Sequence, residues 1–204
     1  NGNTSIVVYD PSPEYIPPAP SYRVTFQIPT TVDFAFQVTL KSNTGLPADA
    51  ESQIRTAIVA AFSGSDGGVR AKIGSTVFAS RYYANVAVLG RWSQIVDIRV
   101  GIDNGAASFV GGISGTVLTV DDVTRGYLEI GQLIQDAGTL VSSGTTIVSL
   151  GTGNGGPGTY TVSLPQDVPD NTSMGSTLLQ NDITLNINQA PAVAPSNIHL
   201  ALEA

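Results

Sequence analysis

His199 is the only histidine in this chain of 204 residues, and the chain has no cysteine. A single histidine cannot form a metal cluster, and thiolate metal sites are excluded. A Ser-His-Asp relay also needs a serine on a sharp turn, as in GxSxG, and neither GISG at 112–115 nor SSG at 142–144 has this pattern. In the closing strand Ile198, Leu200 and Leu202 alternate with His199. We therefore expect His199 to be an exposed strand residue and not a catalytic one.

The acidic residues do not form a recognisable site either. Asp121 and Asp122 could be half of a calcium site, but the spacing of a calcium loop is missing, so a solvated turn is expected. Asp49 and Glu51 fall in the first turn of an expected helix, where the helix dipole favours negative charge. A glycan or peptidoglycan hydrolase needs two carboxylates across a cleft, and no spacing identifies them. The sequence predicts no enzymatic activity, no cofactor and no metal.

Residues 151–156 (GTGNGG) match the GxGxxG dinucleotide-binding fingerprint. That fingerprint requires a strand before the glycines and a helix after them, so that the helix N-terminus can hold the pyrophosphate. Here TTIVSL precedes the glycines and GTYTVSL follows them, and both segments have the character of strands. The pattern therefore predicts a glycine-rich hairpin loop.

Polar loop tips are the better candidates for a binding role, since binding residues commonly sit on loops held by a rigid scaffold. Two loops, 142–146 and 151–159, are rich in Ser, Thr, Asn and Gly, and we expect them to contact a glycan or another subunit. The candidate contact residues are Ser142, Ser143, Thr145, Asn154 and Thr159. Tyr82, Tyr83 and Trp92 could stack on sugars, but their helix and strand spacing favours core or interface positions.

The composition limits the possible partners. Residues 1–102 carry eight Lys and Arg against seven Asp and Glu, whereas residues 103–204 carry only Arg125 against nine acidic residues. No basic stripe exists to neutralise phosphates, so nucleic-acid binding is not expected. No apolar run approaches eighteen residues, so no membrane span is expected. There is no initiating Met or signal-peptide pattern, and we expect the chain to be a piece of a longer protein.

The strand expected at 92–102 (WSQIVDIRVGI) organises the rest of the chain. Val96, Ile98, Val100 and Ile102 share one face, the period of a half-buried strand. A different kind of sequence follows for about seventy residues, and the same alternation returns only from Ile183. We interpret the intervening segment as an insertion.

The flanking segments predict further strands and two helices. Strands are expected at 22–28 and 34–40. A first helix opens at Pro47, buries Ile54, Ile58, Ala61 and Phe62, and ends at the glycines of 64–68. A second helix begins with Ser75 as its cap, presents Phe78, Tyr82 and Val86 to the core, and ends at Gly90.

The expected fold class is an α+β host domain, with an antiparallel or mixed sheet and two helices, plus an inserted all-β small barrel or sandwich. Residues 22–104 with 181–204 form the host domain, and residues 105–180 form the insertion. Residues 1–21 are an extended proline-rich segment, interpreted as a stiff surface connector and less readily as a ligand for an SH3-type groove.

Several phrases of the flanking segments resemble the C-terminal region of baseplate J-like proteins, the wedge components of contractile phage tails and related injection machines. They are VYDPSPEYIPPAPSYRVTFQIPT, FAFQVTL, LPADAESQIRTAIVAAFSGSDGG, IGSTVFASRYYANV, WSQIVDIRVGI and ITLNINQAPAVAPSNIHLAL. In order, these phrases cover most of residues 7–102 and 182–204.

The middle segment is similar to a small β-domain that recurs in phage tail and fibre proteins. The phrases that carry this resemblance are ISGTxLTV and LGTGxGGxGTYTV. The chain departs from the common form at Asp121, Asp122, Tyr127 and Glu129, where apolar, small or Ser/Thr residues are usual.

The resemblance implies a structural component of a bacteriophage tail baseplate that mediates contacts between subunits. Its partners would be other tail or baseplate proteins and copies of itself, and its location would be the virion after synthesis in the host cytoplasm. The β-segment would project outward to contact a protein or the host surface. The alternative is a glycan-binding or adhesin-type receptor-recognition module, with a host-surface glycan as its partner.

Overall fold

A computed structural model describes residues 3–203; residues 1, 2 and 204, which fall in the expected segments 1–21 and 181–204, lie outside the described residues. Strands dominate the fold, with 52% of residues in strands and 12% in helices. The predicted α+β class with an inserted barrel or sandwich is therefore wrong, and the chain has a sheet-rich fold with several sheets. Length is the main reason: two of the strands have 20 residues each, whereas the second α-helix has 5.

A three-stranded sheet lies at the centre of the molecule, in the order β11 (Gln189–Glu203), β3 (Thr30–Lys41) and β5 (Ile95–Ile102). β3 runs antiparallel to β5 and parallel to β11. On β3, the alternate residues Phe34, Phe36, Val38 and Leu40 are completely buried, as the period of two predicts. These side chains form one face of the first core.

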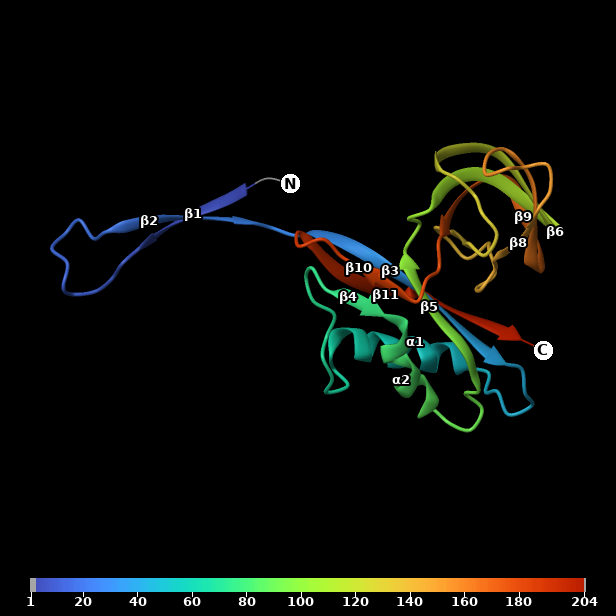
Figure 1. Ribbon diagram of the computed structural model, residues 1–204, viewed down its shortest axis with the longest axis horizontal. Coiled ribbons are helices and arrows are strands. Elements are labelled where there is room, and N and C mark those ends of the chain that lie inside the picture. Colours follow the sequence, from blue (N-terminus) through green and yellow to red (C-terminus); the bar gives the residue numbers. More distant parts are fainter. Residues whose placement is uncertain (1–2, 204) are drawn as a thin grey trace.

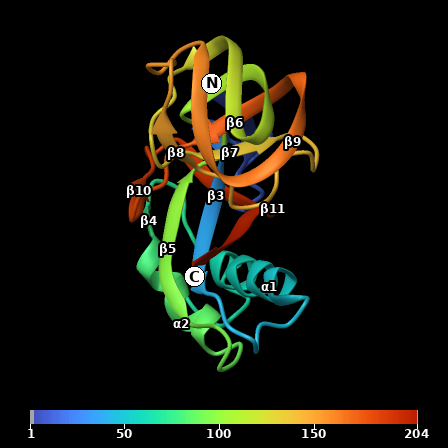
Figure 2. The same cartoon turned by 90° about the vertical axis from the view of Figure 1, so that its right-hand side faces the viewer.

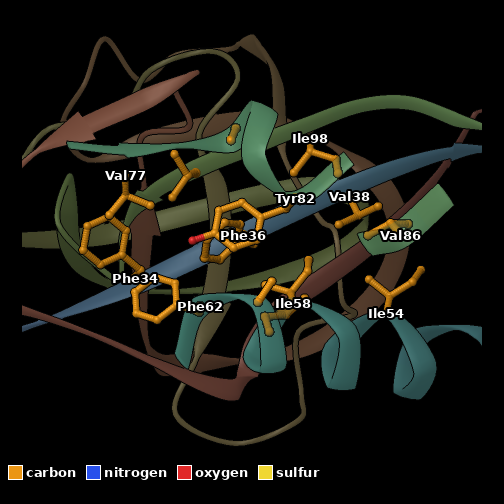
Figure 3. Packing of buried hydrophobic residues seen from close by; sticks show 14 of the residues in the cluster. Phe34, Phe36, Val38, Ile54, Ile58, Phe62, Val77, Tyr82, Val86 and Ile98 are labelled. Carbon is orange, nitrogen blue, oxygen red and sulfur yellow. The ribbon is translucent and has the colours of Figure 1, made fainter. Parts of the chain in front are cut away.

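Helix α1 (Ala50–Ser63) covers that face of the sheet (Figure 2). It buries Ile54, Ile58 and Phe62, as the helical spacing predicts. It ends at Gly64, whose φ of 79° is a left-handed conformation that glycine adopts without strain. Figure 3 shows Phe34, Phe36, Phe62 and Tyr82 grouped between β3 and the helices. The ring centroids of Phe36 and Tyr82 lie 4.8 Å apart, and the two rings meet edge to face.

The second helix is much shorter than predicted. Residues 76–78 form strand β4 (Thr76–Phe78), followed by a 3-10 turn η1 (Ala79–Tyr82) and helix α2 (Tyr83–Ala87). β4 pairs with β10 (Asp182–Thr184), and the hydroxyls of Thr76 and Thr184 lie 2.9 Å apart. Tyr82 and Val86 are buried as expected, but Phe78 is 53% exposed because it belongs to this strand.

Residues 107–177 form a second sheet, in which β9 (Gly158–Thr177) pairs with β6 (Ala107–Gly126), β7 (Leu133–Asp136) and β8 (Ile147–Leu150). It lies beyond the opposite face of the central sheet from α1 (Figure 2). Its side chains enclose a second core, separate from the first, that includes Phe109, Leu118, Leu128, Tyr160 and Met174.

The N-terminal strands form a hairpin arm that extends away from the rest of the molecule (Figure 1). β1 (Asn3–Tyr9) pairs antiparallel with β2 (Ser21–Gln27). The proline-rich residues 10–20 close this hairpin, and an Asp10 N–H···O Pro20 hydrogen bond of 3.0 Å holds the loop at its base. β2 was expected within the host domain, but it pairs with β1 alone.

Candidate functional site

The hairpin arm carries an uncovered apolar face. Residues directly opposite each other in an antiparallel pair project from the same side, and the pairs Ile6–Val24 and Val8–Tyr22 lie on one side together with Phe26. Each of these five side chains is between 46% and 55% exposed. The other side of the hairpin presents Ser5, Val7, Tyr9, Ser21, Arg23, Thr25 and Gln27, which are mostly polar.

An isolated two-stranded hairpin is at best marginally stable in water, and soluble proteins rarely leave a contiguous apolar face uncovered. Covering half-exposed aliphatic and aromatic side chains contributes on the order of 1 kcal/mol each. The arm therefore carries an apolar face that no other described residue covers.

A second candidate lies on the β6–β9 region, where an open hollow has a volume of about 660 Å³. Tyr127, Ile130 and Leu150 provide apolar walls and are 57%, 58% and 42% exposed. Glu129 and Asn154, both exposed, also line the hollow. One rim of the hollow is formed by residues 127–130 and the other by Asn154 and Gly155. A hydrogen bond of 3.0 Å from the Leu128 N–H to the Gly155 carbonyl joins the two rims.

The glycine-rich loop that holds Asn154 is a hairpin between β8 and β9, as the sequence predicts. The hydroxyl of the buried Tyr160 accepts a hydrogen bond of 3.0 Å from the Gly155 N–H and donates one of 2.5 Å to the Gly156 carbonyl. Gly153 leaves the space for this ring, since a Cβ there would lie 2.5 Å from it. Thr159 is half-buried, and its hydroxyl accepts a bond of 3.0 Å from the Thr152 N–H.

The other expected contact loop, 142–146, packs against the central sheet and is not a free tip. Thr145 is completely buried, and its hydroxyl donates to the Ser142 carbonyl at 2.6 Å. Ser142 is exposed, whereas Ser143 is half-buried. A Cβ on Gly144 would lie 2.7 Å from the Leu200 carbonyl oxygen, so the loop is docked directly on β11. The expectation that Thr145 is available for contact is wrong.

His199 is also buried, at 8% exposure, and the expectation of an exposed strand residue is wrong. Its Nε2 lies 3.0 Å from the Gln135 side-chain nitrogen, and its Nδ1 lies 3.3 Å from the Ser143 hydroxyl. The Ser143 hydroxyl donates to Glu51 Oε1 at 2.7 Å. Because the Gln135 nitrogen can only donate, Nε2 accepts and the proton belongs on Nδ1. We call this set of four residues the polar junction.

The polar junction does not have the geometry of a nucleophilic relay. In such a relay the carboxylate orients the histidine and the histidine takes the serine proton. Here the Ser143 proton goes to Glu51, and the far side of the imidazole meets the Gln135 amide. Burial, and then the positive charge of Arg55, lower the pKa of His199 to about 4, so the imidazole is neutral at physiological pH. The arrangement is suited to joining the two cores.

Among the remaining candidates, Asp121 and Asp122 are exposed, but they lie within β6 and not in a turn. Glu51 lies in the first turn of α1, as expected, and pairs with Arg55 at 2.8 Å. Tyr82 belongs to the first core, and the Tyr83 hydroxyl donates to Asp97 at 3.0 Å.

Within residues 3–203, no group of three or more His, Asp or Glu side chains could hold a metal ion. No helix of that range is long and apolar enough to cross a membrane. In the comparisons with known proteins, no family model matches the chain and no curated protein is significantly similar to it.

Proposed function

We propose that this protein is a structural subunit of a larger protein assembly, a contractile-tail baseplate of the wedge type, and that the hairpin arm joins it to a neighbouring subunit. The observation that carries the proposal is the apolar face of the arm, with Ile6, Val8, Tyr22, Val24 and Phe26 all about half exposed. Half-exposed apolar side chains on a projecting hairpin gain hydrophobic stabilisation when another surface covers them.

The shape of the arm favours a protein partner. The register of its two strands places a continuous strip of apolar side chains on one face, whereas the other face is mostly polar and includes Val7 and Tyr9. Sheet packing buries such a strip against an apolar face about 10 Å away. The polar face then remains in water, so one side of the arm is the interface and the other is not.

The resemblance to baseplate J-like proteins supplies the class of assembly, and other tail or baseplate proteins and further copies of this chain are the proposed partners. The low content of charged residues, 12%, agrees with large buried contacts, since interface cores are depleted in charge. The proposal assigns the protein a mechanical role in the virion, without catalysis.

Adjacent residues of β2 provide a matched test. Val24 lies on the apolar face, and Thr25, its neighbour in the strand, lies on the polar face and is also exposed. Val24 and Thr25 are replaced by Asp, one at a time, in a tagged chain that is produced together with the complete set of tail proteins. Tail particles are then purified and assayed for the tag. We expect the wild type and Thr25→Asp to be incorporated and Val24→Asp to be lost from the particles.

Incorporation of Val24→Asp at the wild-type level would overturn the role of the arm. If light scattering shows that the isolated wild-type chain self-associates through the arm but the chain never enters tail particles, the baseplate assignment fails while the assembly role of the arm survives.

A further inference from the structure

We propose that the hollow lined by Tyr127, Glu129, Ile130, Leu150 and Asn154 is a binding site for a neutral or amino-sugar glycan. This activity is independent of the hairpin arm, because the hollow is built entirely from residues around β7, β8 and β9. The glycan is identified by the chemistry of the hollow: an aromatic and aliphatic wall, an acidic rim and a carboxamide.

The hollow has the size and rigidity of a ligand site. A volume of about 660 Å³ lies within the range of about 300–1,000 Å³ for small-ligand pockets. One rim is held by the Gln132 side chain, which donates to the Tyr127 carbonyl at 3.1 Å, and by the Leu128 N–H bond to Gly155. The other rim is fixed through the two hydrogen bonds of the Tyr160 hydroxyl. The backbone of both rims is therefore fixed before a ligand binds, which lowers the ordering cost that a weakly bound ligand such as a sugar must overcome.

The lining matches the two kinds of surface that a sugar ring presents. The exposed side chains of Tyr127, Ile130 and Leu150 can pack against the C–H face of a pyranose, because the face of an aromatic ring is electronegative and attracts C–H groups. Within the described residues, neither the Glu129 carboxylate nor the Asn154 carboxamide has a protein hydrogen-bond partner. Together they offer acceptors and a donor to neighbouring hydroxyl groups.

Charge narrows the class of glycan. Arg125 is the only lysine or arginine of the second half of the chain, and its guanidinium donates to the carbonyl oxygens of Asn104 and Gly105. The lining of the hollow includes no lysine, arginine or histidine to balance an acidic sugar, and the Glu129 carboxylate repels one. Sialylated and other acidic glycans should be rejected, whereas neutral sugars and amino sugars should be accepted.

A protein partner is the competing occupant. A stable protein interface covers about 800 Å² on each side and is centred on a buried apolar anchor. The hollow instead places a carboxylate and a carboxamide beside its apolar walls. This mixture suits a ligand rich in hydroxyl groups better than an apolar side chain.

The test uses the full chain on a printed array of bacterial-surface and mammalian glycans, followed by calorimetric titration with the free oligosaccharides that bind. The variants are Tyr127→Ala and Asn154→Ala. Tyr15→Ala is the matched control, since Tyr15 is another exposed tyrosine, at 44%, and lies in the loop of the arm. We expect about a tenfold or greater loss of affinity in both hollow variants, no change in the control, and sialylated probes to remain unbound in the wild type.

Absence of binding to every neutral and amino-sugar glycan would overturn the proposal. So would binding that is unchanged in Tyr127→Ala, or binding confined to sialylated probes. If Tyr127→Ala instead prevents incorporation into tail particles while the array remains negative, the hollow is a protein contact and the glycan assignment is wrong. A negative array leaves the role of the arm intact, because Val24→Asp tests that surface separately.

Discussion

Acidification should destabilise the fold through His199, and the size of the effect follows from its burial. The pKa of His199 is lowered from 6.5 to about 4 in the folded chain, first by burial and then by the charge of Arg55. Between these two values the unfolded chain binds a proton at this residue and the folded chain does not. The free energy of unfolding therefore falls as the pH falls through this window.

A pKa difference of about 2.5 lowers the free energy of unfolding by about 3 kcal/mol once both states are protonated, at about 1.4 kcal/mol for each pKa unit. From about pH 7 to about pH 5 the expected loss is about 2 kcal/mol, because the folded imidazole is still neutral at the lower value. Protonation would also place a second proton donor against the Gln135 amide nitrogen, 3.0 Å away, which is itself a donor.

The measurement is urea denaturation of the wild type and of His199→Gln at a series of pH values. Gln at this position does not titrate, so the difference between the two curves isolates the imidazole from the surrounding carboxyl groups. One of these, Asp103, has a pKa raised by burial and by the charge of Asp33, and it contributes in the opposite direction. Parallel pH dependence in the two proteins, or a titration of the His199 ring near 6.5 by NMR, would refute the reasoning.

Two further substitutions test how the cores are packed. Gly153→Ala should lower the free energy of unfolding by about 1–3 kcal/mol, because the new Cβ would lie 2.5 Å from the Tyr160 ring. Gly156→Ala is the control and should lower it far less, because a Cβ there has no atom within 4 Å. Thermal melts of both variants measure the difference. Phe36→Ala should lower the free energy of unfolding by about 3–5 kcal/mol, because it leaves a cavity at a fully buried site beside Tyr82. Phe78→Ala should lower it by less than about 1 kcal/mol, because Phe78 is 53% exposed. Urea denaturation of both variants measures these values.

The sequence predicted the local elements of the first core well, because their periods directly reflect burial. The alternation on β3 and the helical spacing on α1 both follow from one apolar face packing on another. Gly64 ends α1 where a left-handed residue is needed. The glycine loop at 151–156 was also assigned correctly, since strand character on both sides excluded a helix N-terminus.

The predictions failed where a distant segment decided the outcome. Strand alternation assigns His199 to the face opposite Ile198, but it cannot say that loop 142–146 covers that face. Thr76 and Val77 are drawn into a strand by pairing with β10, more than a hundred residues away in sequence. The hollow had one local signal: at Tyr127 and Glu129 the chain departs from the pattern of the small β-domain that this segment was expected to resemble. A large exposed ring beside a charge at such a position indicates a surface role.

The two cores are joined by polar contacts, and this has a mechanical consequence. His199 on β11, Glu51 on α1, and Gln135 and Ser143 of the β6–β9 region meet through directional hydrogen bonds. Apolar contacts tolerate sliding, whereas a satisfied buried hydrogen-bond network specifies one arrangement. The junction thus fixes the direction in which the hollow faces relative to the central sheet. Loosening the junction with His199→Gln should weaken that orientation without changing the residues that line the hollow.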